Sequence, residues 1–148
     1  MSLVKSAGNK PERIMERLLK EANITFRSQC DRLDGNPDFV ITRRRVVVFV
    51  DGEFWHGRRF EDWRSKLKPY WLSKIARNMR RDRRNNRALR AKGYSVVRIW
   101  EPDILKRPDW CIARVRRAIA KVRRKKRRVV RMGRADGFGS KGRPDGEC

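Results

Sequence analysis

The sequence predicts a single α/β domain whose helices and strands follow in the order αβββαβα. Segments with apolar residues at helical spacing alternate with short runs of β-branched and aromatic residues, as in α/β proteins. One run, Val46–Asp51, is apolar up to its last residue, which is typical of a strand buried on both faces of a sheet. A chain of 148 residues can build one hydrophobic core but not two, so we expect one domain over residues 1–131.

The N-terminal part of the chain favours a helix followed by an extended segment and a turn. Residues 11–22 carry apolar side chains at helical spacing, and Pro11 and Glu12 suit the first turn of a helix. Residues 24–29 are extended in character. Residues 34–37, Asp-Gly-Asn-Pro, are typical of a turn.

Two strands, at residues 38–41 and 46–51, are predicted next, with the three arginines 43–45 as the hairpin between them. Residues 71–92 then have the length and spacing of a long helix. This helix is expected to stop at the glycine that follows it.

The last two predicted elements are a strand at residues 94–100 and a helix from about Asp109 into a basic tail. Most positions in residues 114–131 are basic, and residues 133–148 are rich in glycine and polar residues. We therefore expect residues 132–148 to be a disordered tail. The basic run is either an electrostatic clamp on DNA phosphates or a solvated tail.

The charge balance predicts a polyanionic partner. The chain has 41 Lys and Arg against 17 Asp and Glu, a net charge of +24, which exceeds what solubility requires. Nucleic acid is the leading candidate and an anionic membrane surface the second. No apolar run approaches the roughly 18 residues of a spanning helix, and residues 1–10 lack the apolar stretch of a signal peptide. We expect a cytoplasmic, nucleoid-associated protein.

Three carboxylates and the only histidine of the chain gather between two predicted strand ends. Asp38 begins one strand, and Asp51 ends the next, followed closely by Glu53 and His56. Because like charges at one sheet edge repel, a divalent cation that prefers oxygen ligands, most simply Mg²⁺, would stabilise them. Such an ion polarises a phosphate and generates hydroxide, and His56 is placed to take a proton from the attacking water. The alternative is that the spacing of the carboxylates has no functional meaning and that the histidine is structural.

The segments that carry these residues resemble the signature of the very-short-patch (Vsr) mismatch-repair endonucleases. The likeness begins in residues 37–40 and 48–57 and continues in residues 70–78, 81–84 and 93–101. It implies a restriction-endonuclease-like core of the PD-(D/E)xK superfamily, with a central mixed sheet flanked by helices. It also implies a nuclease that cuts one strand of duplex DNA beside a mismatch.

The resemblance assigns roles to four acidic or basic side chains. Asp38 matches the family's metal-binding aspartate, and His56 matches its general base. Glu12 matches an acidic residue that assists through metal-bound water, and Asp82 matches an aspartate that supports the site. The implied cofactor is Mg²⁺, with Mn²⁺ as a substitute.

Three positions of the site depart from the family or extend it. Val50 stands where the best-known members have threonine, whose backbone carbonyl contacts the metal, and a carbonyl ligand survives a change of side chain. Asp51 replaces a histidine, and we expect it to become a direct metal ligand. Glu53 either joins the metal site or has a surface role near Arg58.

The family commonly carries a structural zinc, but the matching positions here hold no cysteine or histidine. They are Glu53, Arg58, Phe60 and Pro102. None of these side chains is a zinc ligand of the usual kind. We predict no zinc and expect other contacts to hold the loop after His56.

Helix geometry independently indicates a role for Asp82. It lies in a stripe of spacing four and three that is otherwise largely apolar, formed by Ile75, Met79, Asp82, Asn86 and Leu89. A buried carboxylate must be paired or used. The alternative to a catalytic role is a salt bridge to a neighbouring arginine.

DNA contacts are predicted from aromatic and basic residues near the site. In Vsr enzymes the rings that match Phe54, Trp55 and Trp71 wedge into the base stack, and core packing is the alternative role. Candidate phosphate contacts are Lys66, Lys68, Arg77, Arg80, Arg81 and Arg84.

Three functions remain open at this stage. The first is nicking at a T·G mismatch in DNA repair, and the second is a sequence-specific restriction or homing-type endonuclease. The third is a non-catalytic basic DNA-binding module, which the retained acidic residues argue against. The family implies a cytosine methyltransferase system or mismatch-repair factors as partners, and we expect a monomer rather than a dimer.

Overall fold

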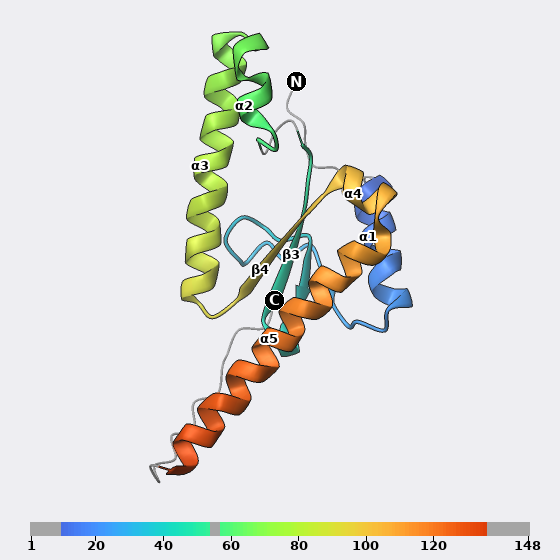
Figure 1. Ribbon diagram of the computed structural model, residues 1–148, viewed down its shortest axis with the longest axis vertical. Helices are drawn as coiled ribbons and strands as arrows, with labels where there is room; N and C mark the ends of the chain where they lie inside the picture. Colours follow the sequence, from blue (N-terminus) through green and yellow to red (C-terminus); the bar gives the residue numbers. More distant parts are fainter. Residues whose placement is uncertain (1–9, 54–56, 136–148) are drawn as a thin grey trace.

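The computed structural model describes residues 10–53 and 57–135 (Figure 1). The elements are α1 (Lys10–Glu21), β1 (Arg27–Ser28), β2 (Phe39–Ile41), the 3₁₀ helix η1 (Thr42–Arg44), β3 (Val46–Asp51), α2 (Phe60–Trp63), the 3₁₀ helix η2 (Arg64–Lys66), α3 (Pro69–Ala91), β4 (Ser95–Trp100), α4 (Glu101–Lys106) and α5 (Pro108–Ala135). The predicted order αβββαβα is confirmed, with two short helices added.

The four strands form one mixed sheet in the order β1-β2-β3-β4. The first two pairings are antiparallel, and β3 pairs with β4 in parallel, with Val46 opposite Ser95 and Asp51 opposite Trp100. Because β3 and β4 run in the same direction, their carboxyl ends lie at the same end of the sheet. The candidate site lies at that end.

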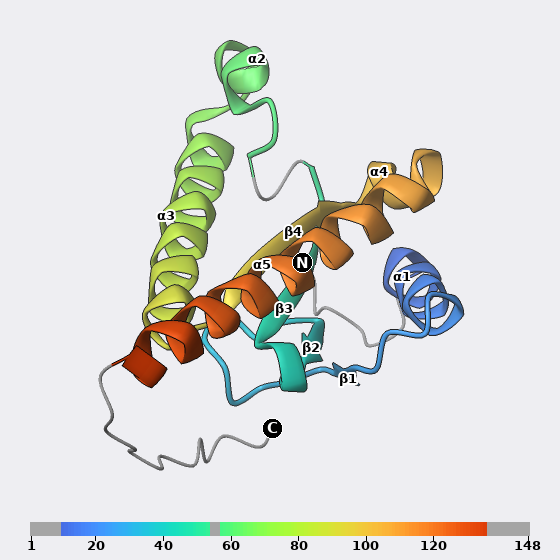
Figure 2. The same cartoon turned by 60° about the horizontal axis from the view of Figure 1, so that its bottom comes forward.

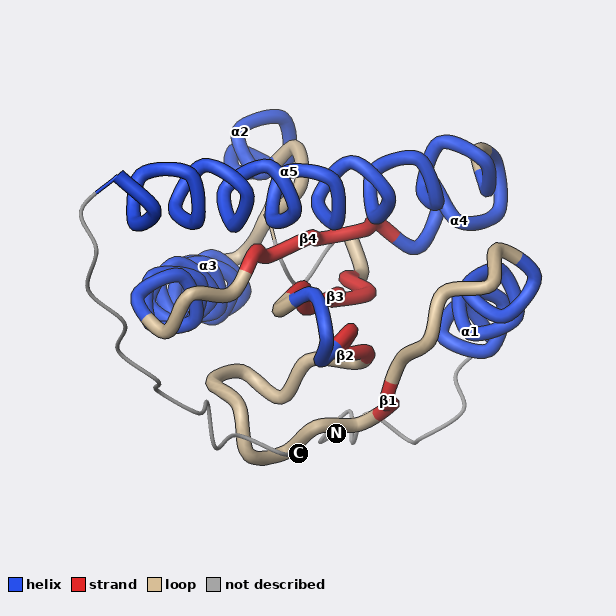
Figure 3. The backbone as a smooth tube through the Cα atoms, turned by 90° about the horizontal axis from the view of Figure 1, so that it is seen from below, coloured by secondary structure: helices blue, strands red, loops and turns tan. Residues whose placement is uncertain are grey.

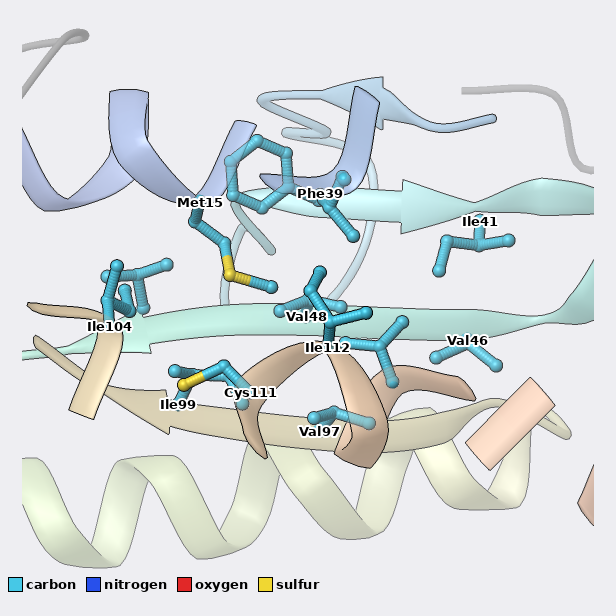
Figure 4. Packing of buried hydrophobic residues seen from close by; sticks show 13 residues of the cluster. Met15, Phe39, Ile41, Val46, Val48, Val97, Ile99, Ile104, Cys111 and Ile112 are labelled. Carbon is cyan, nitrogen blue, oxygen red and sulfur yellow. The ribbon is translucent and has the colours of Figure 1, made fainter. Parts of the chain in front are cut away.

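Helices flank the sheet on both sides (Figure 3). The core on the side of α1 joins that helix to the first part of α5 and to alternate strand residues, among them Val48 and Ile99 (Figure 4). The core on the side of α3 is smaller and includes Val47, Phe49 and Leu89. All six residues of β3 are buried, which confirms that this strand is covered on both faces.

The turn between α3 and β4 follows the glycine signal in the sequence. Gly93 has φ +88°, a left-handed conformation that glycine adopts without strain. A Cβ at this position would lie 3.1 Å from the Arg45 guanidinium, which donates a hydrogen bond to the Lys92 carbonyl. α3 therefore ends where the sequence predicts.

Four local features differ from the sequence prediction. The expected strand at 24–29 has only two paired residues, and a 3₁₀ turn with Arg45 at φ 50° replaces a simple hairpin. The short helices α2 and α4 were missed. The signal for α4 is Pro102 in its first turn, where proline is favoured.

The second half of α5 extends beyond the sheet (Figures 1 and 2). The helix reaches Ala135, four residues beyond the boundary at 131 expected for the domain. Near its start, the Arg114 guanidinium donates a 2.5 Å hydrogen bond to the Arg98 carbonyl of β4. In the described part of the chain, no helix is long and apolar enough to cross a membrane.

Candidate active site

Asp38 lies directly before β2, at the end of the sheet where β3 finishes. Its backbone N–H donates to the Val48 carbonyl at 3.1 Å, and its carboxylate Oδ2 accepts a 2.7 Å hydrogen bond from the Val50 N–H. The side chain is 8% exposed. The carboxylate thus continues the β2–β3 ladder beyond the last paired residues and is fixed in direction.

The Val50 carbonyl faces the same side of β3 as the Val50 N–H. In an extended strand the N–H and C=O of one residue point to the same neighbour, so this carbonyl is directed toward the Asp38 side. Asp38 and Val50 together offer oxygen atoms of two kinds, carboxylate and carbonyl. These are the ligands that Mg²⁺ and other hard cations prefer.

Asp51, the last residue of β3, is paired with an arginine of the neighbouring strand. Its side chain is 1% exposed, and Oδ2 lies 2.6 Å from Nη1 of Arg98. Arg98 is opposite Phe49 in the β3–β4 register, and Asp51 is two residues after Phe49 on the same strand. The Asp51 and Arg98 side chains therefore lie on the same face of the sheet. The arginine compensates the charge of this buried carboxylate.

Arg98 also contacts the polar residues of α3. Its Nε donates to Oδ1 of Asn86 at 3.1 Å, and its Nη2 lies 3.5 Å from Oδ1 of Asp82. The guanidinium lies 4.3 Å from the centre of the Phe49 ring. The stripe predicted on α3 is therefore present, and the salt bridge considered as the alternative for Asp82 is formed.

Arg98 was not predicted as a site residue, although the sequence contains a signal for it. It is the one charged residue in β4, between the buried residues Val97 and Ile99. A charge in such a position needs a partner. The sequence could not name the partner, because the pairing of β3 with β4 spans 47 residues of the chain.

Glu53 is engaged by Arg58 rather than by a carboxylate cluster. Arg58 Nη1 lies 3.0 Å from Glu53 Oε1 and 3.2 Å from Asp103 Oδ2, and its backbone N–H donates to the Glu53 carbonyl. The guanidinium also lies 5.5 Å from the centre of the Trp100 ring. Of the two roles expected for Glu53, the structure shows the contact with Arg58.

We name this group of Glu53, Arg58, Trp100 and Asp103 the Arg58 cluster. Asp103 is 5% exposed, and its Oδ1 also lies 2.9 Å from Nη2 of Arg107, the residue that follows α4. The cluster contains two of the four positions that match the family's zinc ligands, Glu53 and Arg58, and a third, Pro102, directly precedes Asp103. Ion pairs thus occupy a region where the family commonly holds a metal.

For the remaining predicted site residues, the structure gives only the position of Glu12. Glu12 is half-buried in the first turn of α1, a helix that contacts α4. Phe54, Trp55 and His56 lie outside the described residues. Within residues 10–53 and 57–135, no three acidic, histidine or cysteine side chains are grouped to hold a metal ion.

The predicted DNA contacts that lie within the described residues are on the segment from η2 along α3. Trp71 is half-buried, with its ring 5.1 Å from the Tyr70 ring and 5.8 Å from Nζ of Lys74. The six basic candidates are all exposed: Lys66, Lys68, Arg77, Arg80, Arg81 and Arg84. They are available to a ligand on this side of the molecule.

Comparisons with known proteins place this site in a family. A sequence model described as DNA mismatch endonuclease Vsr matches residues 1–62. The type II nicking enzyme V.NmeDIP of Neisseria meningitidis serogroup C is 36% identical over 118 residues, which cover 78% of this chain and 80% of that enzyme. The chain belongs to the Vsr family. Its resemblance to that family is thereby confirmed.

Other relatives carry names of the same kind. The type II nicking enzyme V.HpaIIP of Haemophilus parainfluenzae is 34% identical over 78% of this chain and 84% of its own length. The DNA mismatch endonuclease Vsr of Escherichia coli (strain K12) is 36% identical over 61% of this chain and 59% of its own. This Vsr-family chain is a DNA endonuclease that acts on double-stranded DNA.

A solved structure agrees with the fold. The catalytic domain of the homing endonuclease I-Bth0305I superposes with a TM-score of 0.55 at 23% identity, covering 78% of this chain and 98% of that domain. The predicted fold class, a mixed sheet flanked by helices in a restriction-endonuclease-like core, is confirmed.

Proposed function

We propose that this Vsr-family chain is a Mg²⁺-dependent endonuclease that nicks one strand of duplex DNA at a T·G mismatch during repair. The observation that carries the proposal is the fixed Asp38 carboxylate beside the Val50 carbonyl, at the sheet end where β3 stops. Burying a carboxylate at the end of a strand is costly in free energy, and a bound cation would offset that cost.

Asp38 and the Val50 carbonyl would hold the divalent ion, and Mn²⁺ would substitute for Mg²⁺. When bound, the ion supplies Lewis-acid polarisation of the scissile phosphate and a bound water of lowered pKa. His56 accepts the proton of the attacking water in this proposal, and Glu12 assists from the first turn of α1. Asp38 keeps its direction through the Val50 hydrogen bond.

Asp51 and Glu53 take positioning roles in this proposal rather than direct metal ligation. Each carboxylate is matched by an arginine, Arg98 for Asp51 and Arg58 for Glu53. A guanidinium at this distance competes with a cation for the same oxygen atoms. Asp82 acts through Arg98, which it contacts from α3.

Phe54, Trp55 and Trp71 are assigned to the base stack beside the mismatch, where unstacking must be offset by new contacts. Lys66, Lys68, Arg77 and Arg81 are assigned to phosphates, which position the duplex without reading its sequence. A cytosine methyltransferase system or mismatch-repair factors would be the partners in the cell, and the enzyme would act as a monomer.

A second candidate is site-specific cutting of matched DNA. Two relatives of which this chain covers 80% and 84% are named type II nicking enzymes, a name that does not mention mismatches. Such an enzyme would share the metal site of the first proposal. The two differ in the duplex that is cut and in whether one strand or both are cut.

The test compares matched duplexes with duplexes that contain one T·G mismatch, with each strand labelled separately. Reactions contain Mg²⁺ or EDTA, and the wild-type chain is compared with Asp38→Asn and with the exposed control Asp31→Asn. A Mg²⁺-dependent nick in one strand of the mismatched duplex, lost only in Asp38→Asn, is the expected result. Cutting of matched duplexes would favour the second candidate, and no cutting with any divalent ion would overturn both.

A further inference from the structure

Helix α5 has two halves with different surroundings. Its first half belongs to the core, where Cys111, Ile112 and Val115 are buried and side chains up to Val122 are partly buried. Every side chain from 123 to 132 is exposed. The second half of this long helix is therefore not held by contacts with the core, and Figure 2 shows it passing beyond the sheet.

After Asp109 in its first turn, helix α5 carries charge of one sign only. Residues 110–135 include twelve Lys and Arg and no Asp or Glu. Like charges three and four positions apart on a helix destabilise it. A helix with this composition and without core contacts gains stability when an external polyanion compensates the repulsion.

The basic side chains are not spread evenly around the helix. Six of them follow spacings of three and four, which places them on one flank: Arg114, Arg117, Lys121, Arg124, Arg128 and Arg131. We call this set the α5 stripe. At about 1.5 Å per residue it extends over about 25 Å. Arg116 and Arg123 fall on the opposite flank of the helix.

Two hollows lie along the α5 stripe. The inner one, of about 400 Å³, is lined by the first three stripe residues, by Ser95 of β4 and by Arg90 at the end of α3. The outer one, of about 530 Å³, is lined by the last three stripe residues with Arg127 and Met132. No acidic side chain lines either hollow. The α5 stripe thus borders hollows that carry basic and apolar side chains but no acidic ones.

The inner hollow connects the α5 stripe to a second line of arginines. Arg80, Arg83, Arg87 and Arg90 are exposed on α3 at spacings of three and four, and Arg90 reaches the hollow. The basic surface therefore continues from α3, which carries predicted DNA contacts, onto α5. One extended ligand with regularly repeated negative charge fits such a surface better than separate small anions.

We propose that the α5 stripe binds the sugar-phosphate backbone of duplex DNA, as a second DNA-binding surface away from the metal site. The inference rests on duplex DNA as the substrate. A duplex carries one negative charge per about 1.7 Å of its axis, so a stripe of this length meets several phosphates. Phosphate contacts add affinity and orientation without sequence preference.

The test uses two variants of the full chain with equal loss of charge on the same helix. The stripe variant carries Arg117→Gln, Lys121→Gln and Arg128→Gln, and the control carries Arg116→Gln, Arg123→Gln and Lys126→Gln. All six side chains are exposed. Binding of a labelled duplex is measured by fluorescence anisotropy in EDTA over a range of salt concentrations, so cleavage is not needed for the readout.

The stripe variant should bind about 10- to 100-fold more weakly, with the slope of log K against log salt reduced by about 2 to 3. The control should change each quantity much less, and the cleavage rate at saturating DNA should be equal in all three proteins. Equal losses in both variants would overturn the proposal, because net charge alone would then explain binding. Failure of the nicking assay would leave this comparison intact.

Two further measurements separate DNA from other ligands. Circular dichroism at 222 nm should show more helix when duplex DNA is added to the wild-type chain, and less gain in the stripe variant. The second measurement is the binding of each protein to vesicles that contain anionic phosphatidylserine. If the stripe variant, but not the control, lost vesicle binding while its DNA binding stayed unchanged, the proposal would be overturned in favour of a membrane surface.

Discussion

The carboxylate of Asp51 and the guanidinium of Arg98 form a 2.6 Å ion pair at the carboxyl end of the two parallel strands. Asp51 is buried, while Arg98 also contacts Asp82 and Asn86 on α3. The pair therefore joins the central strand, the last strand and α3 at one point. Asp51 directly follows Val50, so the pair holds the end of β3 that carries the Val50 carbonyl.

Removing Arg98 should destabilise the protein strongly. Arg98→Ala leaves Asp51 buried without this compensation, and we expect a loss of about 3 kcal/mol in the free energy of unfolding. Urea unfolding of Arg98→Ala, Asp51→Ala and the double variant provides a double-mutant cycle. A coupling energy of about 2 kcal/mol is expected for residues in direct contact. Additive losses would show that the pair contributes nothing beyond its separate side chains.

Asp38 and Asp51 should differ in their response to the metal. Asp38→Asn should lower the cleavage rate more than about 100-fold at any Mg²⁺ concentration, because a charged ligand is lost. Asp51→Asn should lower stability but leave the Mg²⁺ concentration for half-maximal cleavage nearly unchanged. Titration of cleavage with Mg²⁺ on both variants measures this difference. A large shift in the Mg²⁺ requirement of Asp51→Asn would make Asp51 a ligand.

Arg58 should fix the segment between β3 and α2. Arg58→Ala removes the link from Glu53 to Asp103, and we expect a slower cleavage step with little change in DNA affinity. Arg58→Lys keeps the charge but not the two-sided geometry and should recover only part of the rate. Zinc chelation should leave the wild-type melting temperature unchanged. A chelator-induced fall in melting temperature would show that a metal, not the ion pairs, holds this region.

Cys111 should make the stability depend on alkaline pH. Burial, and secondarily the Asp103 charge, raise the pKa of its thiol above the ordinary value of 9.0. Above pH 9 the unfolded chain loses this proton while the folded chain keeps it, so stability falls with rising pH by up to about 1.4 kcal/mol per unit. Unfolding of wild-type and Cys111→Ala proteins between pH 8 and 10 measures the difference. Parallel curves would contradict the expectation.

The parts of the fold that were predictable are those with a local signal. β3 was predictable from five consecutive β-branched or aromatic residues, 46–50, and α3 from its length and the glycine that follows it. β1 is shorter than expected because only Arg27 and Ser28 pair with β2. α2 has four residues, too few for a periodic pattern.

The candidate site was predictable in its location but not in its pairings. The placement of Asp38 and Asp51 at one end of the sheet followed from strand boundaries. The arginine partners did not, because Arg98 reaches Asp51 through the parallel pairing of strands distant in sequence. Arg58 is only five residues from Glu53, yet the sequence alone left its contact and metal ligation equally open.

The hydrogen bond from Arg114 to the Arg98 carbonyl affects whether the sheet can pair with the sheet of another molecule. β4 is the outer strand on one side of the sheet, and α5 covers it while the guanidinium occupies one of its carbonyl groups. On the other side the outer strand has only two residues, both exposed. One edge strand of this sheet is short, and the other is covered by α5. Few backbone N–H and C=O groups are therefore available to pair with a strand of another molecule. The same helix that carries the basic stripe thus shields the sheet from self-association while leaving its charged flank open to solvent.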